Sequence, residues 1–384
     1  MIFASTLFSR AVDPVIPKIA ADLAIDVKTA ALLSTAFTFP YAIMQPALGT
    51  IGDFFGKTRL MNASLIAVVT TTLVCAFAHN FSLLVAMRVI AGVCAGGIFP
   101  VGVALVGDLV PVQARQVAIG RLLAVGLTGN LIGAVISGGI GDFLGWRGVF
   151  FSIGGFGLIS AVIAFFAFRS LPTAKPKPFN LGAAAAGFRD VLSDPRAKVC
   201  FGSVFFEGIV IHGMFPFVAL LLLTAGETHY SSYAGVVIAG FGLGGIVFSL
   251  ALPFLVPRLT ERQLMLSGAF GAAVAFCLIA FNMVWYVQAA IFVLFGLCFY
   301  MLHNCIQVHV TDLSQTARGA ALSMHSSAFF TGQAIGPVYY GFAFSHLGVH
   351  IPPLFGAVVI LIIGFICAHL LRHRRPSPDL AERL

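Results

Sequence analysis

Gly49-Thr50-Ile51-Gly52-Asp53-Phe54-Phe55-Gly56-Lys57-Thr58-Arg59 is a short polar stretch between two long apolar runs of the chain. Three glycines, one acid and two cations fall within these eleven residues. Polar turns between apolar segments are common, but this order of residues is specific. The apolar runs determine the fold class. The polar stretch between them indicates which family of proteins within that class the chain resembles.

The composition is that of a membrane protein. Of 384 residues, 59% are hydrophobic and 9% are charged, whereas soluble domains carry about 25% charged residues. The runs are apolar on all sides and exceed about 18 residues, the length that crosses the hydrocarbon core as a helix. They also lack the alternating polarity of a membrane β-barrel. We therefore expect an all-α, polytopic membrane protein.

Several function classes lack their signatures. The net charge of +8 comes from cations in the loops between spans, so we exclude nucleic-acid binding. The seven cysteines lie in or beside apolar runs without CxxC spacing, which indicates small packing residues. There is no P-loop and no HExxH motif. We expect no enzymatic activity, no metal and no cofactor.

Twelve apolar segments are long enough to be membrane spans. No cationic region precedes the first segment, which argues against a cleaved signal peptide and leaves open a natural start upstream of Met1. The predicted ranges are 2–20, 28–50, 60–79, 82–107, 117–141, 148–168, 198–223, 232–255, 263–283, 285–309, 317–344 and 350–371.

The cations are distributed unevenly among the loops. Alternate loops and the C-terminal tail hold 17 of the 22 Lys and Arg residues. The opposite loops hold Lys28 and Arg147, with Lys18 at the end of a span. Because cations accumulate on the cytoplasmic side, we expect both termini in the cytoplasm.

A polar linker at 169–197 divides the spans into six and six. It contains Lys175-Pro176-Lys177-Pro178, which is typical of a stiff connector. An alanine-rich stretch at 181–188 follows, and we expect it to form a short helix at the membrane surface. The predicted domains are an N-terminal bundle at 1–168, the linker at 169–197, a C-terminal bundle at 198–371 and a tail at 372–384.

The two halves repeat one another. Asp108 follows the fourth span and Asp312 follows the tenth. A GxxxG motif begins at Gly129 in the fifth span and at Gly332 in the eleventh. Matching positions in two halves are characteristic of one transporter architecture.

Charged residues within spans are the first functional candidates, because they are costly in lipid and usually line a cavity or a proton path. Arg10 and Asp13 lie three residues apart on one helix face. We predict reversible protonation at Asp13; the alternative is a self-neutralising structural pair. Arg88 in the fourth span either reaches the interface as an anchor or neutralises an acid such as Asp13.

The seventh and tenth spans carry a second set of candidates. Glu207 is a lone carboxylate, and we predict that it couples transport to protons or to substrate charge. The alternative places it near the cytoplasmic face without such a role. His303, Asn304 and Gln307 lie on one side of the tenth span, where His303 is either a packing residue or a proton carrier.

A polar stripe follows the second span. Ser34, Thr38, Tyr41 and Gln45 recur every three or four residues on one helix face. In lipid such a face points inward, either to line a cavity or to bond neighbouring helices. Asn130 in the glycine-rich fifth span is a further polar candidate. With Arg10 and the tenth-span residues, these side chains form the predicted substrate cavity.

The opening stretch, Gly49-x-x-x-Asp53-x-x-Gly56-Lys57-x-Arg59, resembles the signature loop of the major facilitator superfamily between spans two and three. Arg88-x-x-x-Gly92 is similar to that superfamily's second motif. The resemblance extends in order over essentially the whole chain, and the layout of six spans plus six agrees with it.

Two further motifs resemble those of drug:proton antiporters within this superfamily. Asp13 followed by Pro14 and Pro17 is similar to their first-span motif. The glycine-rich run in the fifth span resembles the antiporter motif, with Ala134 and Ser137 where that motif has proline and glycine.

The resemblance implies twelve transmembrane helices in two pseudo-symmetric six-helix bundles that transport by alternating access. It implies that the acid at position 53 helps to lock the halves together on the cytoplasmic side. We therefore assign the conformational gate to the signature loop and proton coupling to three buried charges. The gate residues are Gly49, Asp53, Gly56, Lys57 and Arg59, and the coupling residues are Asp13, Glu207 and Arg88.

The predicted function is proton-coupled efflux of a small amphipathic compound by a monomer in a bacterial inner membrane. Its partners are the small-molecule substrate, protons and the lipid bilayer. Proton-coupled uptake of a small organic anion is the alternative, because Arg10, Arg88 and His303 could supply a cationic site. A non-transporting membrane sensor is a remote alternative, since the chain offers no soluble signalling domain.

Overall fold

The structure is a computed structural model that describes residues 1–169, 181–314 and 316–371. These residues are helical throughout most of their length and contain no strand, so the prediction of an all-α fold is confirmed. At some helical positions the structure describes the backbone but not the side chain. These positions are 48–54, 107, 112, 113, 115–117, 119, 120, 123, 124, 127, 181, 183 and 184.

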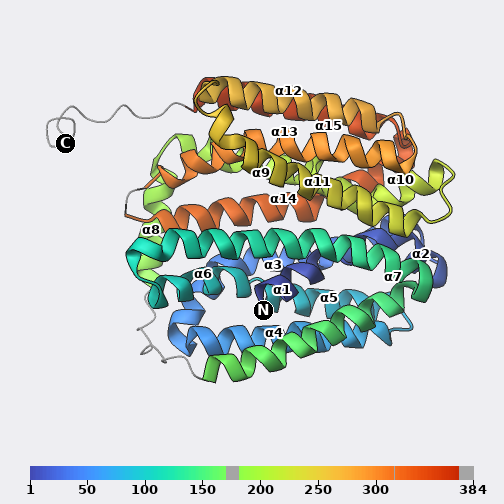
Figure 1. The fold of residues 1–384 in the computed structure, drawn as a ribbon, viewed down its shortest axis with the longest axis horizontal. Coiled ribbons are helices and arrows are strands. Elements are labelled where there is room, and N and C mark those ends of the chain that lie inside the picture. Colours follow the sequence, from blue (N-terminus) through green and yellow to red (C-terminus); the bar gives the residue numbers. More distant parts are fainter. Residues whose placement is uncertain (170–180, 315, 372–384) are drawn as a thin grey trace, which may run out of the picture.

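The helices run side by side along one direction (Figure 1). One end of the bundle carries α8 (Leu181–Ser193), and the other carries α2 (Ile16–Asp22) and α10 (Val218–Thr224). We call these the α8 end and the α10 end. Met1 lies part-way along the bundle (Figure 1), and the cytoplasmic position of the termini stays a prediction.

The helices follow the twelve predicted ranges in order. The N-terminal half comprises α1 (Ile2–Arg10), η1 (Asp13–Val15), α2, α3 (Val27–Phe55), α4 (Lys57–Ala76), α5 (Phe81–Ala95), α6 (Ile98–Leu109) and α7 (Val112–Arg169). The C-terminal half comprises α9 (Arg196–Val210), η2 (His212–Phe217), α10, α11 (Tyr230–Leu255), α12 (Glu261–Ile279), α13 (Trp285–Thr311), α14 (Arg318–Leu347) and α15 (Ile351–Leu370).

Eight segments of the described chain are long and apolar enough to cross a membrane. One of these, Thr128–Arg169, is 42 residues long, which is sufficient for two crossings at 1.5 Å per residue. The predicted spans at 2–20, 28–50 and 317–344 are also helical.

Three predicted spans are broken, and proline accounts for each break. Proline lacks a backbone N–H, and its ring clashes with the carbonyl four residues earlier. Pro14 and Pro17 follow α1, where the short helix η1 replaces a regular turn. Pro100 lies four residues after Gly96, where α5 ends. Pro216 lies within η2, which interrupts the seventh span. The predicted spans at 2–20, 82–107 and 198–223 are each present as a succession of shorter helices, and Phe81–Val106 and Arg196–Thr224 are still long and apolar enough to cross a membrane.

The fifth and sixth predicted spans are the two arms of α7, which are joined at a kink and not by a longer loop. Its single non-helical residue is Gly145, with φ 68° and ψ 179°, and the chain turns back there (Figure 1). A positive φ of this size favours glycine. The neighbouring Trp146 Nε1 and Arg147 Nη1 donate to Asp22 Oδ2, at 3.2 and 2.6 Å, and fix this turn against α2.

Local chemistry also determines where other helices begin. The Asp26 carboxylate accepts hydrogen bonds from the amide and hydroxyl of Thr29 at the start of α3. These bonds hold the pKa of Asp26 below its usual range, and the bond from the Thr29 amide contributes most to this shift. Gly56 precedes α4 with φ 93°, a conformation that explains the glycine in the signature loop. Thr260 and Gln263 form a capping box at α12.

The halves pack through two helix pairs, α3 against α14 and α7 against α11. Small residues allow this close approach, because a methyl group at Gly138 would overlap the Ser231 carbonyl of the opposite half. Gly235 approaches the Ala134 carbonyl in the same way.

Polar contacts cross the same interface at the α10 end. Asp142 Oδ2 of α7 accepts from the Ser232 amide at 2.8 Å and from the Ser232 hydroxyl at 2.5 Å. Within the N-terminal half, Lys18 Nζ also forms an ion pair with Asp142 Oδ1 at 2.8 Å. Farther along the interface, Thr35 Oγ1 donates to the Ala334 carbonyl at 2.7 Å. The described hydrogen bonds between the halves therefore lie both at the α10 end and farther along the interface.

The predicted linker helix is present as α8, which packs against α14. The stretch Lys175-Pro176-Lys177-Pro178 and the tail at 372–384 lie outside the described residues. The predicted domain boundaries at 168, 197 and 371 stay predictions.

Candidate functional site

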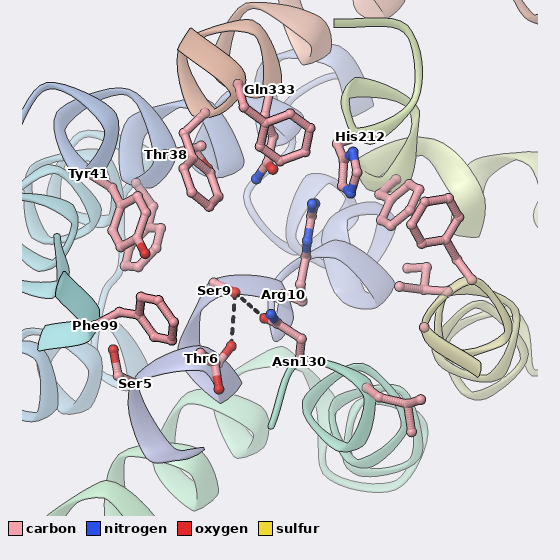
Figure 2. A pocket seen from close by; sticks show the side chains of 18 of the residues that line it. Ser5, Thr6, Ser9, Arg10, Thr38, Tyr41, Phe99, Asn130, His212 and Gln333 are labelled. Carbon is pink, nitrogen blue, oxygen red and sulfur yellow. Dashed lines mark hydrogen bonds between the residues drawn. The ribbon is translucent and has the colours of Figure 1, made fainter. Parts of the chain in front are cut away.

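A cavity of about 250 Å³ lies between the two halves, near the middle of the bundle (Figure 2). Helices α1, α3, α6 and α7 line it from the N-terminal half, and η2, α11, α13 and α14 line it from the C-terminal half. The lining residues are Ile2, Ser5, Thr6, Ser9, Arg10, Phe37, Thr38, Tyr41, Ile98, Phe99, Asn130, Leu131, His212, Phe215, Ile238, Phe241, Gly242, Phe299, Tyr300, His303, Phe329, Phe330 and Gln333.

The broken helices border this cavity. Arg10 is the last residue of α1, Phe99 lies in the first turn of α6, and His212 and Phe215 belong to η2. Discontinuous membrane helices commonly form transporter binding sites, because their ends expose polar groups to a cavity at mid-membrane depth. Proline therefore positions the cavity wall as well as breaking the helices.

One wall of the cavity is polar. Ser5, Thr6 and Ser9 of α1 contribute hydroxyl groups to it, and the Ser9 hydroxyl donates to Asn130 Oδ1 of α7 at 2.7 Å (Figure 2). Thr6 also donates to backbone carbonyls of its own helix. Gln333 lies across the cavity from these residues (Figure 2). This wall offers hydrogen-bonding groups to a ligand.

The other wall is aromatic and centres on His212. The rings of Phe215, Phe241, Phe299 and Phe329 have centroids 4.9–5.3 Å from the His212 ring centroid. Such edge-on and tilted arrangements are favourable for aromatic pairs. A cavity with one polar wall and one aromatic wall suits an amphipathic ligand.

The N-terminal half buries a charged pair behind the cavity wall. Asp13 is fully buried, and Arg10 Nη1 donates to its Oδ2 at 3.2 Å. The Ser34 hydroxyl donates to Asp13 Oδ1 at 2.6 Å. The Arg10 guanidinium also lies 4.7 Å from the Phe215 ring centroid, across the interface between the halves. Both carboxylate oxygens of Asp13 therefore have a donor.

The C-terminal half buries a second acid in a comparable place. Glu207 of α9 is fully buried, and its Oε2 lies 2.7 Å from Nδ1 of His303 on α13. Its Oε1 has no hydrogen-bond partner among the described residues. His303 lines the cavity, so Glu207 lies one side chain behind the wall. The His325 ring lies 5.1 Å from that of His303.

Arg88 has backbone carbonyls, and neither of the two acids, as its described hydrogen-bond partners. It is buried, with 3% of its surface exposed, and it donates to the carbonyls of Leu33 and Phe8 at 3.3 and 3.4 Å. Its guanidinium lies 4.3 Å from the Phe37 ring centroid. Its burial contradicts the alternative of an interfacial anchor, and among the described contacts Arg88 forms no hydrogen bond with Asp13. Instead it connects α5 with α1 and α3.

Comparison with known families decides the class of protein. The family model described as Major Facilitator Superfamily matches residues 1–233 and 217–383. The chain belongs to the major facilitator superfamily. The resemblance that the motifs indicated is thereby confirmed, and the chain is a multi-pass membrane transporter of this superfamily.

Characterised relatives and a solved structure agree with this assignment. The chain is 25% identical to the quinolone resistance protein NorA of Staphylococcus aureus, over 94% of this chain and 92% of that one. It is 25% identical to multidrug resistance protein 2 of Bacillus subtilis, over 94% and 91%. A crystal structure of a bacterial homolog of the human lysosomal transporter Spinster has a TM-score of 0.78 and 19% identity, over 98% of this chain and 97% of that one. The structural match shows a shared fold.

The predicted cavity residues of this superfamily member divide into two groups. Arg10, Thr38, Tyr41, Asn130 and His303 line the cavity. The others do not belong to the described lining: Ser34 bonds to Asp13, Gln45 is buried elsewhere along α3, Asn304 is half-buried and Gln307 is exposed.

The orientation of α13 explains why Asn304 and Gln307 do not line the cavity. Phe299, Tyr300 and His303 form this face, and Asn304 is turned about 100° away from His303 around the helix. Gln307 lies one turn farther along α13, beyond the cavity.

The superfamily signature loop is described in part. Lys57 Nζ pairs with Asp108 Oδ2 at 2.5 Å, which connects α4 to the end of α6 within one half. Arg59 is exposed. The side chains of Gly49 and Asp53 lie outside the described residues, and the gating role of the loop stays a prediction.

Several lining residues were absent from the prediction. Ser5, Thr6 and Ser9 lie on one face of α1, so the spacing argument used for the second span would have identified them. His212 and Gln333 carry no comparable signal. The lining phenylalanines are also indistinguishable in a chain with 38 phenylalanines.

Proposed function

We propose that the chain exports a small amphipathic compound in exchange for protons by alternating access. The observation that carries this proposal is the cavity between the halves, with one polar wall, one aromatic wall and a buried acid behind each half. The names of the relatives, quinolone resistance and multidrug resistance, support export of small molecules.

The proposed proton-coupling residues are Asp13 and Glu207. Glu207 and His303 can share, bind or release a proton next to the cavity, because each partner exists in a neutral and a charged form. Asp13 can do so only when its pairing with Arg10 changes. Arg88 supports the N-terminal site by holding the carbonyls of α1 and α3.

The proposed orientation places the α8 end in the cytoplasm of a bacterium, with the protein in the inner membrane. The cation-rich loops support this choice. The signature loop then lies on the cytoplasmic side, where we propose that Gly49, Asp53, Gly56, Lys57 and Arg59 gate the conformational cycle.

Flux measurements in inverted membrane vesicles test this function. With an acidic vesicle interior, vesicles that contain the protein should accumulate an export substrate from a panel of quinolones and other amphipathic compounds, and a protonophore should abolish the accumulation. Failure with the whole panel, together with uptake in intact cells, would sink the export proposal.

That second outcome would favour proton-coupled uptake of an organic anion, for which Arg10 in the cavity wall is the supporting observation. A non-transporting sensor is eliminated by any solute flux that is lost in Asp13→Asn.

The gating role has its own test. Asp53→Asn should slow exchange of bound ligand across the membrane while ligand binding to the purified protein stays within about threefold of the wild type. Loss of binding together with normal exchange would contradict the gating role.

A further inference from the structure

The charges that face the cavity are of one sign. Among the described residues that line it, Arg10 is the one permanently charged side chain, and none is Asp or Glu. The other basic groups in the lining are His212 and His303. A ligand in this cavity therefore meets cationic and neutral groups.

The two nearby acids are not available to a ligand. Asp13 and Glu207 are both fully buried and do not belong to the cavity lining. Asp13 is bound by Arg10 and Ser34, and Glu207 is bound by His303. Neither carboxylate can therefore contact a cationic ligand unless its present partner moves away.

Arg10 retains binding capacity toward the cavity. A guanidinium has five N–H donors, and the bond to Asp13 uses Nη1 alone, at 3.2 Å. The side chain projects into the cavity between Asn130 and His212 (Figure 2). A second carboxylate can bind the remaining donors, because charge-assisted bonds to planar carboxylates are the strongest that arginine makes.

The surroundings of Arg10 favour an apolar body on that anion. The Phe215 ring lies 4.7 Å from the guanidinium, and Phe241 and Phe299 continue the aromatic wall. The cavity volume of about 250 Å³ lies just below the range of common ligand pockets. One or two fused rings are a suitable size.

We propose that the cavity binds a small aromatic anion, with its carboxylate on Arg10 and its rings among the phenylalanines. The inference rests on the proposed transport function and assigns it a substrate class. A lipophilic cation would find no acid in the described lining to pair with, because the Asp13 carboxylate that offsets the Arg10 charge lies behind the wall and is already bound.

Three probes of nearly equal size and different charge test the proposal: 2-naphthoate, 2-naphthamide and 2-naphthylmethylammonium. Their affinities for the purified full-length protein in detergent are measured by calorimetry. We expect the Kd of naphthoate to be at least ten times lower than that of naphthamide, with the ammonium probe weakest. Equal affinities, preference for the ammonium probe, or no naphthoate binding would overturn the proposal.

A double variant tests the role of Arg10. Arg10→Gln with Asp13→Asn removes both charges together, so that neither is left buried without its partner. It should bring the naphthoate Kd within about threefold of that of naphthamide, while naphthamide binds as in the wild type. The double variant Arg147→Gln with Asp22→Asn removes a matched pair at the α10 end and should leave the preference unchanged.

If the double variant does not fold, the single substitution Arg10→Lys tests the same role. Arg10→Lys keeps the charge but loses the planar donor fork. It should weaken naphthoate binding several-fold and still prefer naphthoate over the ammonium probe. A preference for naphthoate that is unchanged in both Arg10 variants would assign the anion to another group.

Flux in vesicles separates this inference from the transport proposal. Naphthoate binding without flux of any compound would overturn transport and leave the anion site in place. Flux of cations without naphthoate binding would leave transport in place and overturn the anion site.

Discussion

The two halves bury one acid each behind the same cavity, but they pair it with different bases. Asp13 is held by Arg10, which is three residues away in the sequence and carries a permanent charge. Glu207 is held by His303, which is 96 residues away and can be neutral. Both acids are fully buried, so they differ in the base that binds them and in the Ser34 hydroxyl, a second donor that Asp13 has and Glu207 lacks among the described residues.

Because of this difference, we expect Asp13 to stabilise the structure and Glu207 to bind and release protons. Removal of the Asp13 charge leaves a buried guanidinium that cannot lose its proton, which is strongly unfavourable. Removal of the Glu207 charge leaves an imidazole that can be neutral. The C-terminal site can therefore change its protonation at lower cost, and we expect it to carry more of the proton coupling than the N-terminal site.

The largest expected effect is a loss of stability in Asp13→Asn. The substitution leaves Arg10 without its counter-charge, and breaking a buried pair in this way costs about 3 kcal/mol. The free energy of unfolding in SDS titrations measures the change. Adding Arg10→Gln should recover most of the loss. A single variant as stable as the wild type would show that Arg10 is hydrated, and would remove the contrast between the sites.

Glu207→Gln should have the opposite profile. The neutral amide can still contact a neutral His303, so the free energy of unfolding should change by less than about 1 kcal/mol. Gradient-driven accumulation in inverted vesicles should fall on the order of 50-fold, because the amide cannot bind and release a proton. Ligand exchange without a gradient should persist. Normal accumulation would transfer proton coupling to the N-terminal half.

His303→Gln should have an intermediate effect on transport. Glu207 keeps its carboxyl group but loses its titratable partner. We expect gradient-driven accumulation to fall about tenfold, which is less than the usual contribution of a proton-transfer group because the acid itself is retained. His346→Gln is the control, because His346 is exposed on α14 and its Nδ1 contacts a carbonyl of its own helix. Equal activity of the two variants would contradict a role for the Glu207–His303 pair.

The smallest effect is expected at Ser34. Ser34→Ala removes one of the two donors to Asp13, and single hydrogen bonds in membrane proteins contribute about 0.6 kcal/mol, up to about 1.7. We expect a loss of about 1 kcal/mol in SDS unfolding. Ser64→Ala, at a buried serine of α4, controls for the loss of a hydroxyl group. A loss as large as that in Asp13→Asn would mean that Ser34, and not Arg10, stabilises the carboxylate.

The fold was largely predictable because its main signal is local. A run of about twenty apolar residues defines a membrane helix wherever it occurs, and the twelve predicted ranges match helices of the structure. The breaks were less predictable. Pro40, Pro46 and Pro337 lie within continuous helices, whereas Pro100 and Pro216 accompany breaks. The neighbouring helices decide which outcome occurs.

In the site, too, contacts between residues close in the sequence were predictable, and contacts between distant residues were not. The contact between Arg10 and Asp13 follows from helical spacing. The contact between Glu207 and His303 joins residues 96 positions apart, and spacing along one chain contains no such information. For the same reason the sequence placed Gln307 in the cavity, because helical spacing gives the face of a helix but not the depth at which the cavity ends.

Asp142 supplies α11 with a cap that α11 does not provide for itself. The residue before that helix, His229, makes no capping bond with its side chain, and the Ser232 amide is bonded by a carboxylate of the opposite half. When the halves separate at the α10 end, this amide must exchange its partner for water, because an uncapped helix end leaves its first N–H groups free. The rate of deuterium uptake at the Ser232 amide therefore reports how often the α10 end opens.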